Sequence, residues 1–451
     1  MEPFRFHVFI CDQQKPEGVP CCSVRGSARV IEALRREIGA RGLVNEVQVT
    51  ACGSLGLCEH GPNMVVYPEG IWYSELTPED VPEILRSHFQ EGVPVARLVR
   101  DDQAGVRAEI IASRDKFLAA QRAREASGVL PDEWNDRIRA FQESRAILTA
   151  LELDVFTAVG EGATAEAVAA KTATDPRAAA MLLDALTAIG LLAKCGGTYG
   201  NTAVSRRYFC ASSSDNARPA LLHTAHLWAR WSTLTDCVRS GTAMPRPETG
   251  SEDWTEAFIA AMHRNAAERA PHVVRAVDAA GVRRMLDVGG GSGAYSIAFA
   301  KANPVLHAEI LDLPAVTAIA QRHIRAAGVE ERVQPRAGDL RTDALGCGFD
   351  LVFVSAICHM LSPEENADLL RRCHGALAPG GRVVIQDFIL NPEKTGPKFA
   401  ALFALNMLVG TAAGSSYSEP EYTDWLAAVG FREIRHVRLP GPSGLMIGVR
   451  V

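Results

Sequence analysis

The sequence lacks three patterns that would assign it to large classes of protein. No apolar stretch reaches the roughly 20 residues of a transmembrane helix, so we expect no membrane partner. Residues 1–10 lack the continuous apolar core of a secretory signal peptide, so we expect a cytoplasmic location. No long basic run occurs and the formal net charge is -6, which argues against a nucleic-acid partner.

The composition is that of a globular protein with more than one domain. Charged residues make up 22% of the 451 residues and hydrophobic residues 47%, which is ordinary for folded domains. The cysteine count of 11 is high for a chain without a secretory signal. Such cysteines are better interpreted as thiols or metal ligands than as a disulfide framework.

The most informative segment is Met285–Tyr295, which predicts a buried strand, a glycine loop and the start of a helix. Glycines allow backbone amides to approach a ligand closely, and the N-terminus of a helix offers unpaired donors. One strand–helix unit later, residues 308–314 predict a second strand that ends in an acid, Asp312, which suits two ribose hydroxyls. Together the two segments predict an adenosine-containing cofactor at the carboxyl ends of parallel strands.

Strands and helices alternate from Arg284 onward, which indicates an α/β fold with a largely parallel sheet covered by helices on both faces. A hairpin is expected to close the sheet at the C-terminus. The predicted strands lie near residues 285–288, 308–312, 332–337, 351–355, 382–388, 432–439 and 445–451.

The glycine loop alone leaves two cofactors open. Read loosely, Gly289-x-Gly291-x-x-Ala294 satisfies the dinucleotide fingerprint, whose last position tolerates alanine. The wider sequence resembles instead the class I S-adenosylmethionine-dependent methyltransferases. From about residue 134 to 451 it resembles one family of these, the O-methyltransferases with an N-terminal dimerisation domain, of the acetylserotonin, caffeate and bacterial polyketide type. The matching segments are Leu286–Gly293, Asp312–Pro314, Ala337–Leu340, Ile357–His359 and Leu377–Val383.

This resemblance implies a Rossmann-like methyltransferase domain over residues 241–451 that binds S-adenosyl-L-methionine. Asp312 is expected at the ribose hydroxyls and Asp339 near the adenine, with Leu340 packed on the ring. The glycines line the methionine side, and Asp287 organises the loop or contacts the amino group through water. The full set of predicted cofactor-binding residues is Asp287, Gly289, Gly291, Gly293, Asp312, Leu313, Asp339 and Leu340.

His359 is the predicted catalytic base. It follows the strand 351–354 at its carboxyl end, where open α/β sheets bind ligands, and histidine suits proton removal near neutral pH. The segment Ile357–Met360 resembles the family's Ile-Cys-His-Asp-Trp, whose histidine deprotonates the acceptor hydroxyl. Plant members frame that histidine with two glutamates, which fall here on Asp387, a shorter acid, and near Ser416. We therefore expect Asp387 to replace the orienting carboxylate only in part.

The acceptor pocket is expected to be built from aromatic and methionine side chains on the helices before and after the glycine loop. Side chains of this kind at helical spacing also form ordinary cores, and His263 is the polar exception that could contact the acceptor. The predicted substrate residues are Trp231, Phe258, Met262, His263 and Met407, with Trp228 and Phe403 beside them.

Residues 132–240 are predicted to form a helical domain of winged-helix type. Residues 145–156 place apolar side chains on one continuous face, as a core or dimer helix does. Helices over 164–171 and 175–189 precede two short strands near 191–193 and 197–199, which is the winged-helix pattern. The resemblance implies that this domain serves dimerisation and not DNA binding, so we expect a homodimer.

Residues 1–90 predict a separate α/β domain. Strands over 6–10, 47–50 and 64–67 and helices over 27–38 and 81–89 give a β-α-β-β-α order, which is thioredoxin-like. Residues 91–131 are expected to be a linker followed by a charged helix. The first ninety residues resemble the thioredoxin-like [2Fe-2S] ferredoxins, through the segments Ser23–Gly26, Leu57–Pro62 and Val65–Tyr73.

The resemblance implies a [2Fe-2S] cluster, but the ligand pattern departs from the family. That family places two cysteines after the first strand and a Cys-x3-Cys later. Here the first pair is Cys11 with Cys22 or with Cys21, and the partner of Cys58 at the expected spacing is Ser54. A degenerate domain without a cluster, or a zinc site, are the alternatives. The predicted metal ligands are Cys11, Cys22, Cys52 and Cys58.

The sequence thus predicts a methyltransferase that acts on a hydroxyl of a small aromatic or apolar molecule and carries an iron–sulfur or iron–sulfur-derived module. A redox protein is a further possible partner. Three alternatives remain: a C-methyltransferase that acts on a flat ring such as a tetrapyrrole, a redox-responsive regulator that binds S-adenosylmethionine without turnover, and a nicotinamide-dependent oxidoreductase.

Overall fold

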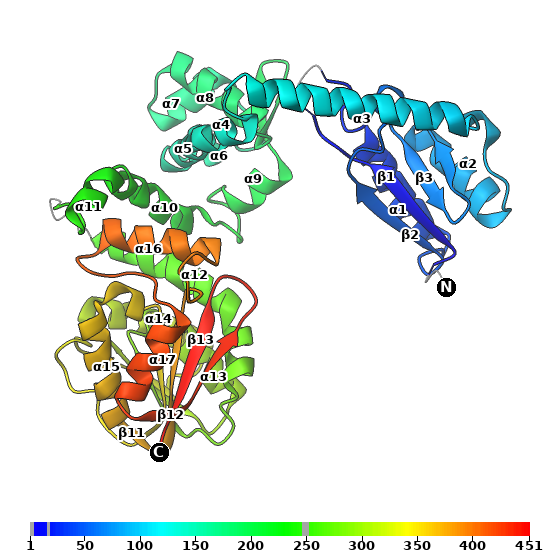
Figure 1. The fold of residues 1–451 in the computed structure, drawn as a ribbon. Helices are drawn as coiled ribbons and strands as arrows, with labels where there is room; N and C mark the ends of the chain where they lie inside the picture. Colours follow the sequence, from blue (N-terminus) through cyan, green and yellow to red (C-terminus); the bar gives the residue numbers. More distant parts are fainter. Residues whose placement is uncertain (1–3, 16–18, 246–251) are drawn as a thin grey trace. The chain divides into compact units, whose positions relative to one another are not determined.

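The computed structural model describes residues 4–15, 19–245 and 252–451, without the side chains of residues 252–257. The chain divides into two compact units, residues 1–137 and 138–451, which are described one at a time. Figure 1 shows the elements of both units.

The first unit is built on a sheet of four strands in the order β2-β1-β3-β4. β1 is parallel to β2 and antiparallel to β3. Sequence analysis missed β4, because a strand of three residues is too short for its alternation to be recognised. It also predicted one helix over 81–89, where an α-helical turn passes into a π-helical segment. The elements are β1 (Phe6–Cys11), α1 (Ser27–Ala40), β2 (Val47–Cys52), β3 (Met64–Tyr67), β4 (Ile71–Tyr73), α2 (Val81–Ile84) and η3 (Leu85–Gln90).

The core of this unit lies between the sheet and its helices. α1 buries Val30, Leu34 and Ile38 at helical spacing against Val8 and Ile10 of β1. Each fully buried aliphatic side chain of this size contributes about 1.5–3 kcal/mol relative to an exposed one. The polar residues of α1 lie on its other face, so the helix forms as predicted.

Residues 92–102, predicted as a linker, instead join the first unit, and the helix that follows packs on it. Val99 forms a β-bridge with Tyr73, and a short 3-10 turn, η4 (Ala96–Leu98), precedes it. α3 (Gln103–Ala126) begins at Asp102, whose Oδ1 accepts a hydrogen bond from Gly105 N at 2.9 Å.

The first turns of α3 contact the loop that follows β2. Val106 is buried, and Glu109 forms ion pairs with Arg100 at 3.0 Å and with His60 at 3.6 Å. A Cβ on Gly56 would lie 3.0 Å from Ile110 Cγ2, so only glycine allows the helix to approach this closely.

The second unit begins with a small helical bundle that carries a two-stranded wing, β5 paired with β6. Its core gathers Leu151, Phe156, Val168 and Leu183 around Tyr199. The winged-helix order predicted from the sequence is present. The elements are α4 (Asp132–Arg139), which crosses the boundary between the units, α5 (Phe141–Glu152), α6 (Val155–Val159), α7 (Ala165–Thr172), α8 (Pro176–Ala188), β5 (Leu192–Cys195), β6 (Thr198–Asn201) and α9 (Ala203–Tyr208).

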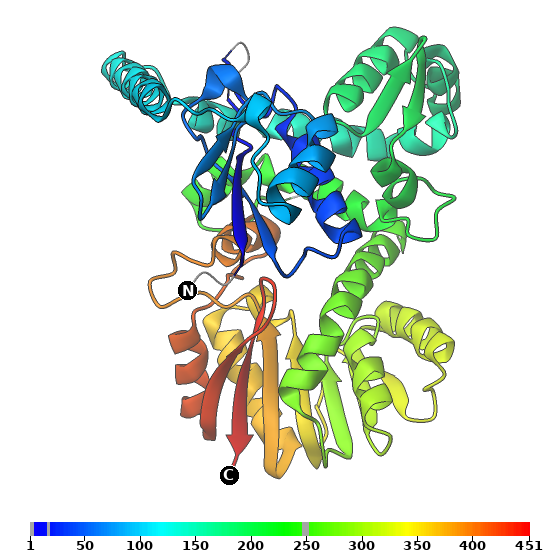
Figure 2. The same cartoon turned by 90° about the vertical axis from the view of Figure 1, so that its right-hand side faces the viewer.

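Three helices connect this bundle to the large sheet: α10 (Arg218–Trp231), α11 (Leu234–Ser240) and α12 (Glu252–Val277). The chain turns at Ser232 and Thr233, between α10 and α11. Figure 2 shows α12 running from this region down along one face of the sheet.

The large sheet has seven strands, as the sequence predicted. Their order in the sheet is β12-β13-β11-β10-β7-β8-β9. β7 to β11 are parallel, and β13 is antiparallel to both of its neighbours. β11 is longer than predicted, because it begins at Leu377. The strands are β7 (Arg284–Val288), β8 (His307–Asp312), β9 (Val333–Ala337), β10 (Phe349–Ser355), β11 (Leu377–Asp387), β12 (Phe431–Arg438) and β13 (Gly444–Arg450).

Helices cover both faces of this sheet and give it two cores. Along β10, Leu351 and Phe353 face one core while Val352 and Val354 face the other, because successive side chains of a strand point to opposite sides. α12, α13 (Ala294–Ala302) and α14 (Pro314–Ala327) cover the first face, and α15 (Pro363–Ala376) and α17 (Glu419–Ala428) cover the second.

Two elements lie at the carboxyl ends of the central strands. The short 3-10 turn η5 (Cys358–Met360) follows β10, and α16 (Lys398–Gly410) follows β11. α16 contacts η5, α10 and α11 (Figure 1). This end of the sheet is therefore enclosed by a helix, and the glycine loop after β7 opens onto the same end.

We expect Gly56→Ala to lower the stability of the first unit more than Gly70→Ala. Both glycines have left-handed backbone (φ 88 and 70), so both variants lose about 1–2 kcal/mol for strain. Only Gly56 faces Ile110, which adds about 1–3 kcal/mol of overpacking, whereas a Cβ on Gly70 meets no atom within 4 Å. Chemical denaturation of both variants measures the difference, and equal losses would contradict the proposed contact with α3.

Candidate active site

The glycine loop after β7 is packed so tightly at Gly289 and Gly293 that a side chain is excluded there. Gly289 and Gly293 have φ of 67 and 77, in the region that favours glycine. A Cβ on Gly289 would overlap Ile357 and lie 3.4 Å from Leu340 Cδ2, and one on Gly293 would lie 2.7 Å from Ile310 Cδ1. The predicted cofactor residues Gly289 and Leu340 are thus neighbours.

Asp312 ends β8 and holds the glycine loop. Its Oδ2 accepts a hydrogen bond from Gly291 N at 2.8 Å, and its Oδ1 accepts one from Leu313 N at 2.8 Å. Burial raises the pKa of this carboxyl group above its ordinary value, although both hydrogen bonds lower it. Asp312, the residue predicted to bind the ribose, therefore contacts the glycine loop directly.

Asp287 lies beneath the same loop and is completely buried. Its Oδ2 accepts a hydrogen bond from Ser296 Oγ at 2.6 Å, while Oδ1 has no hydrogen-bond partner among the described residues. Burial raises the pKa of this carboxyl group to about 7, with the nearby Asp312 adding to the shift. The third acid predicted to bind the cofactor, Asp339, is half-buried and accepts a hydrogen bond from Arg341 N at 2.8 Å.

His359 and Asp387 form a buried pair. His359 lies in η5 after β10, Asp387 ends β11, and the distance from Nδ1 to Oδ1 is 2.7 Å. His359 is 6% exposed and Asp387 is 2% exposed. Sequence analysis expected Asp387 to replace the orienting carboxylate only in part, but the shorter acid contacts the imidazole directly. The second position, Ser416, is buried, and its hydroxyl has no partner among the described residues.

Aromatic rings surround this pair. The ring of Phe403, on α16, meets the imidazole of His359 edge to face, with 4.8 Å between centroids. Phe388 lies 4.5 Å from Phe403 and 4.9 Å from Phe399 in the same measure. The guanidinium of Arg269 lies 5.5 Å from the centroid of Phe388. The base thus faces an apolar, aromatic environment.

The predicted substrate residues do not all meet at this base. Trp231 Nε1 donates to Asn406 Oδ1 at 3.0 Å, which ties α10 to α16, and Met407 is buried on α16. On α12, Phe258 stacks edge to face on His223, Met262 is half-buried, and His263 contacts Ser292 Oγ at 2.8 Å and stacks on His323 at 3.9 Å. His263 therefore contacts the glycine loop, a role that the sequence did not reveal.

Sequence reasoning also missed the residues that support the base. Tyr422, on α17, donates its hydroxyl hydrogen to Asp387 Oδ2 at 3.1 Å. Asn366, on α15, donates to the carbonyl oxygen of Cys358 at 2.9 Å and fixes the turn that carries His359. Neither residue belongs to a motif segment, so only the folded chain brings them to the site.

The cysteines of the first unit form pairs. The thiols of Cys11 and Cys22 share a hydrogen bond that lowers the pKa of Cys11 to about 6 and raises that of Cys22. Cys58 Sγ lies 3.3 Å from Ser54 Oγ and accepts a hydrogen bond from Lys15 Nζ at 3.0 Å. Cys52 lies beside Cys11 in the register of the sheet.

No group of three or more histidine, cysteine, aspartate or glutamate side chains surrounds a single metal position within the described parts of the chain. In those parts no helix is long and apolar enough to span a membrane. Of the four predicted metal ligands, Cys11 lies close to Cys22 and opposite Cys52, whereas Cys58 contacts Ser54, which was not among the four.

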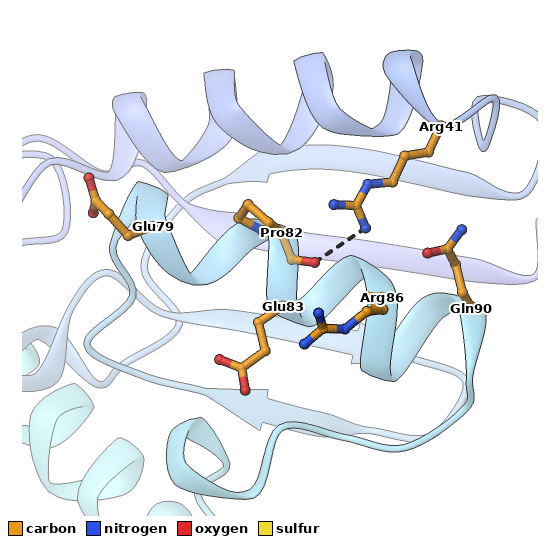
Figure 3. A pocket seen from close by; sticks show the side chains of 6 residues that line it. All are labelled: Arg41, Glu79, Pro82, Glu83, Arg86 and Gln90. Carbon is orange, nitrogen blue, oxygen red and sulfur yellow. Dashed lines mark hydrogen bonds between the residues drawn. The ribbon is translucent and has the colours of Figure 1, made fainter.

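Each unit has a surface hollow, and His359 lines neither of the two. One, of about 500 Å³, is lined by charged side chains at the C-terminal end of α1 and along α2 and η3 (Figure 3). In this hollow Arg41 donates a hydrogen bond to the carbonyl oxygen of Pro82. The hollow therefore lies at the end of α1 opposite to the end that Cys22 precedes. The second, of about 440 Å³, is apolar and lies between α5 and α10, with Trp228 and Trp231 in its wall.

Comparison with known proteins identifies the second unit. The model of the O-methyltransferase dimerisation domain matches residues 136–210, and that of the O-methyltransferase domain matches residues 237–432. 3-Hydroxy-5-methyl-1-naphthoate 3-O-methyltransferase of Streptomyces sahachiroi is 35% identical over 333 residues, which are 71% of this chain and 95% of that enzyme. The chain belongs to the O-methyltransferase family.

Further relatives support the assignment of this O-methyltransferase. Acetylserotonin O-methyltransferase of Mus musculus is 30% identical over 340 residues, 70% of this chain and 87% of that enzyme. The structure of PigF with SAH is 28% identical with a TM-score of 0.67, and covers 71% of this chain and 100% of that one. The glycine loop therefore serves S-adenosylmethionine and not a nicotinamide. Both family models begin after residue 135, so they do not identify the first unit.

We expect the cofactor-free O-methyltransferase to lose stability as the pH rises from about 5 to 8, and Asp287→Asn to lose less. The folded protein keeps a proton on Asp287 up to a pKa of about 7, whereas the unfolded chain releases it at an ordinary carboxyl pKa. Because the folded state then binds more protons across this window, its unfolding free energy falls with rising pH. Melting temperatures measure this, with the exposed Asp236→Asn as control. Parallel curves for wild type and Asp287→Asn would contradict it.

Proposed function

We propose that this O-methyltransferase methylates a hydroxyl group on an aromatic ring, with His359 as the base. The observation that carries the proposal is the buried contact of 2.7 Å between His359 Nδ1 and Asp387 Oδ1. With Nδ1 occupied by the carboxylate, Nε2 is the nitrogen left for the acceptor hydroxyl. No hydrogen bond to Nε2 occurs among the described residues.

In this mechanism the chain binds, orients and removes one proton. His359 Nε2 takes the proton of the acceptor hydroxyl, and Asp387 stabilises the imidazolium that forms. S-adenosylmethionine supplies an electrophilic methyl group, so a carbon–oxygen bond forms as a carbon–sulfur bond breaks. Asp312 and the glycine loop would hold the cofactor in place, and α16 would exclude water from the reacting oxygen.

The surroundings of His359 support an aromatic acceptor. The rings of Phe388, Phe399 and Phe403 offer flat apolar surfaces, against which an aromatic ring packs favourably. Tetracenomycin polyketide synthesis 8-O-methyl transferase of Streptomyces glaucescens, by its name, acts on a polyketide and is 29% identical over 323 residues. The match to the dimerisation domain supports a homodimer as the active form.

Transfer to carbon is the alternative for the acceptor. L-tyrosine C(3)-methyltransferase of Streptomyces lavendulae is 35% identical over 184 residues, which are 50% of that enzyme. The relatives that match over two thirds of this chain and are named O-methyltransferases favour oxygen. Nuclear magnetic resonance of the product separates the two outcomes, since O-methyl and ring C-methyl groups have different shifts.

For the first unit we propose a [2Fe-2S] cluster that is held by two pairs of ligands. Each iron of such a cluster takes two protein ligands. Cys11 with Cys22 is one pair and Ser54 with Cys58 is the other. This arrangement agrees with the absence, within the described residues, of three ligands around one position.

Hydrogen-bond donors around these sulfur atoms support the proposal. Backbone amides of Gln13 and Leu55 donate to the sulfur of Cys11, and Asn63 donates to the sulfur of Cys22 at 3.5 Å. Such donors stabilise negative charge on sulfur, as an iron–sulfur site requires. We favour Ser54 over Cys52 as the fourth ligand, because the hydroxyl of Ser54 already contacts Cys58. Cys52 is instead held in the sheet as the last residue of β2.

A bound cluster supplies one-electron chemistry, which methyl transfer does not need. We therefore propose that the first unit regulates the enzyme or docks a redox partner protein and takes no part in the methyl transfer itself. The contacts of α3 with the loop that carries Ser54 and Cys58 place the first turns of this helix next to the proposed ligands.

We expect His359→Ala to lower kcat with a phenolic acceptor about 10²–10⁴-fold, the usual contribution of a positioned base. Asp387→Asn, which keeps the shape of the side chain, should also lower kcat. The affinity for S-adenosylmethionine should stay unchanged, because neither side chain contacts the glycine loop. Steady-state kinetics and calorimetric titration measure the two effects. Full activity of His359→Ala would exclude it as the base.

Anaerobically purified protein should contain about two irons and show visible charge-transfer bands. We expect Ser54→Ala to lose or weaken these bands and Ser54→Cys to keep or strengthen them. Cys52→Ala is the matched control and should keep the wild-type spectrum. Loss of the cluster in Cys52→Ala but not in Ser54→Ala would assign Cys52 as the ligand instead. A colourless protein without iron would exclude the cluster.

A further inference from the structure

Tyr422 stands behind the base, on the side of Asp387 that does not face His359. It lies in the second turn of α17, a helix that covers one face of the sheet. Its hydroxyl is 3.1 Å from Asp387 Oδ2, and the residue is 1% exposed. The phenol hydroxyl of this core residue therefore points at the carboxylate of the proposed catalytic pair.

The start of α17 fixes the position of this tyrosine. Ser418 and Glu421 form a capping box, in which the backbone N–H of Ser418 donates to Glu421 Oε2 at 2.8 Å. The rings of Tyr417 and Trp425 meet that of Tyr422 edge to face, at 6.2 and 5.5 Å between centroids. The phenol is therefore held from both sides and has little freedom to turn away from Asp387.

Four donors saturate the two oxygens of Asp387. Oδ1 accepts from His359 Nδ1 at 2.7 Å and from Phe388 N at 2.8 Å. Oδ2 accepts from His359 N at 3.2 Å and from the hydroxyl of Tyr422 at 3.1 Å. Two of the four donors are backbone amides and one is the base, so Tyr422 is the one other side chain that fixes the carboxylate among the described residues.

We propose that Tyr422 is a positioning residue for methyl transfer: its hydroxyl holds Asp387 in the orientation in which the carboxylate accepts the hydrogen bond from His359 Nδ1. The proposal rests on His359 as the base, as argued above. Tyr422 acts only through Asp387, because the structure gives it no contact with the imidazole.

The other titratable groups around the pair keep a fixed charge over the working pH range. Burial raises the pKa of Tyr422 well above its ordinary value, with Asp387 adding to the shift, so the phenol stays a donor. Burial likewise raises the pKa of the Cys358 thiol in η5, of Cys373 in α15 to about 12, and of Tyr417. Arg269, from α12, is a permanent cation over Phe388. A change in the pH profile therefore reports on the His359–Asp387 pair.

The test is Tyr422→Phe, which removes one oxygen and keeps the ring. We expect kcat to fall about tenfold to hundredfold, the effect of one hydrogen bond to a charged group, while KM for both substrates stays constant. The acid limb of the kcat/KM profile should move to higher pH. Without the phenol, Asp387 is a stronger acceptor and stabilises the protonated imidazole more.

Tyr417→Phe is the matched control. Tyr417 is also buried, and its hydroxyl donates to the carbonyl oxygen of Leu361 instead of to Asp387. We expect this variant to lose thermal stability without a shift of the pH profile. If Tyr422→Phe shows only that same loss of stability, with wild-type kcat and pH profile, Tyr422 has a structural role and the proposal is overturned.

A double-mutant cycle separates this proposal from the one on which it rests. In the Asp387→Asn background, Tyr422→Phe should cause little further loss of kcat, because the two residues act as one unit. A full additional loss would show that Tyr422 acts elsewhere and would overturn the proposal. If His359→Ala keeps full activity, the base itself is wrong. If His359→Ala is inactive and Tyr422→Phe is normal, only the inference about Tyr422 fails.

Discussion

The parallel pairing of β10 with β11 is the constraint on which the site depends. Ser355 lies opposite Gln386 in the register, so both strands end at the same edge of the sheet. The turn after β10 then carries His359 to the residue that ends β11, Asp387. Two side chains separated by 28 positions meet at 2.7 Å because backbone hydrogen bonds fix where each strand stops. A slip of one residue would turn Asp387 to the other face of the sheet and break the pair.

The contacts of Gly289 with Ile357 and of Asp312 with Gly291 N join segments that are distant in the chain. The predicted cofactor residues nevertheless follow strands whose apolar pattern is strong, and their role in binding stays a prediction. All seven strands of the large sheet were predicted from such patterns. What the sequence did not show depends on long-range packing. Tyr422 reaches Asp387 across 35 positions, and His263 reaches Ser292 across 29.

The first unit shows the same division between local and long-range information. The strands and helices around its core follow the spacing of apolar residues in the sequence. β4 is the exception, because it is too short to show such a spacing. Cys58 meets Ser54 only four positions away within one loop, whereas spacing alone left Cys21 and Cys22 equivalent as the partner of Cys11. The contact of Gly56 with Ile110 forms only when α3 packs on the loop that follows β2. The sequence predicted a linker before this helix and gave no sign of that packing.

The hydrogen bonds of Asp312 have a consequence for the way the cofactor enters. Because Gly291 N and Leu313 N already hold both carboxylate oxygens, Asp312 and the glycine loop are ordered by contacts within the protein. A mobile loop would lose conformational entropy when a ligand binds, whereas an ordered loop has already lost it during folding. More of the interaction free energy is therefore left for affinity. The nucleoside therefore meets a rigid receptor, and association is governed by diffusion and desolvation and not by a slow closure of this loop.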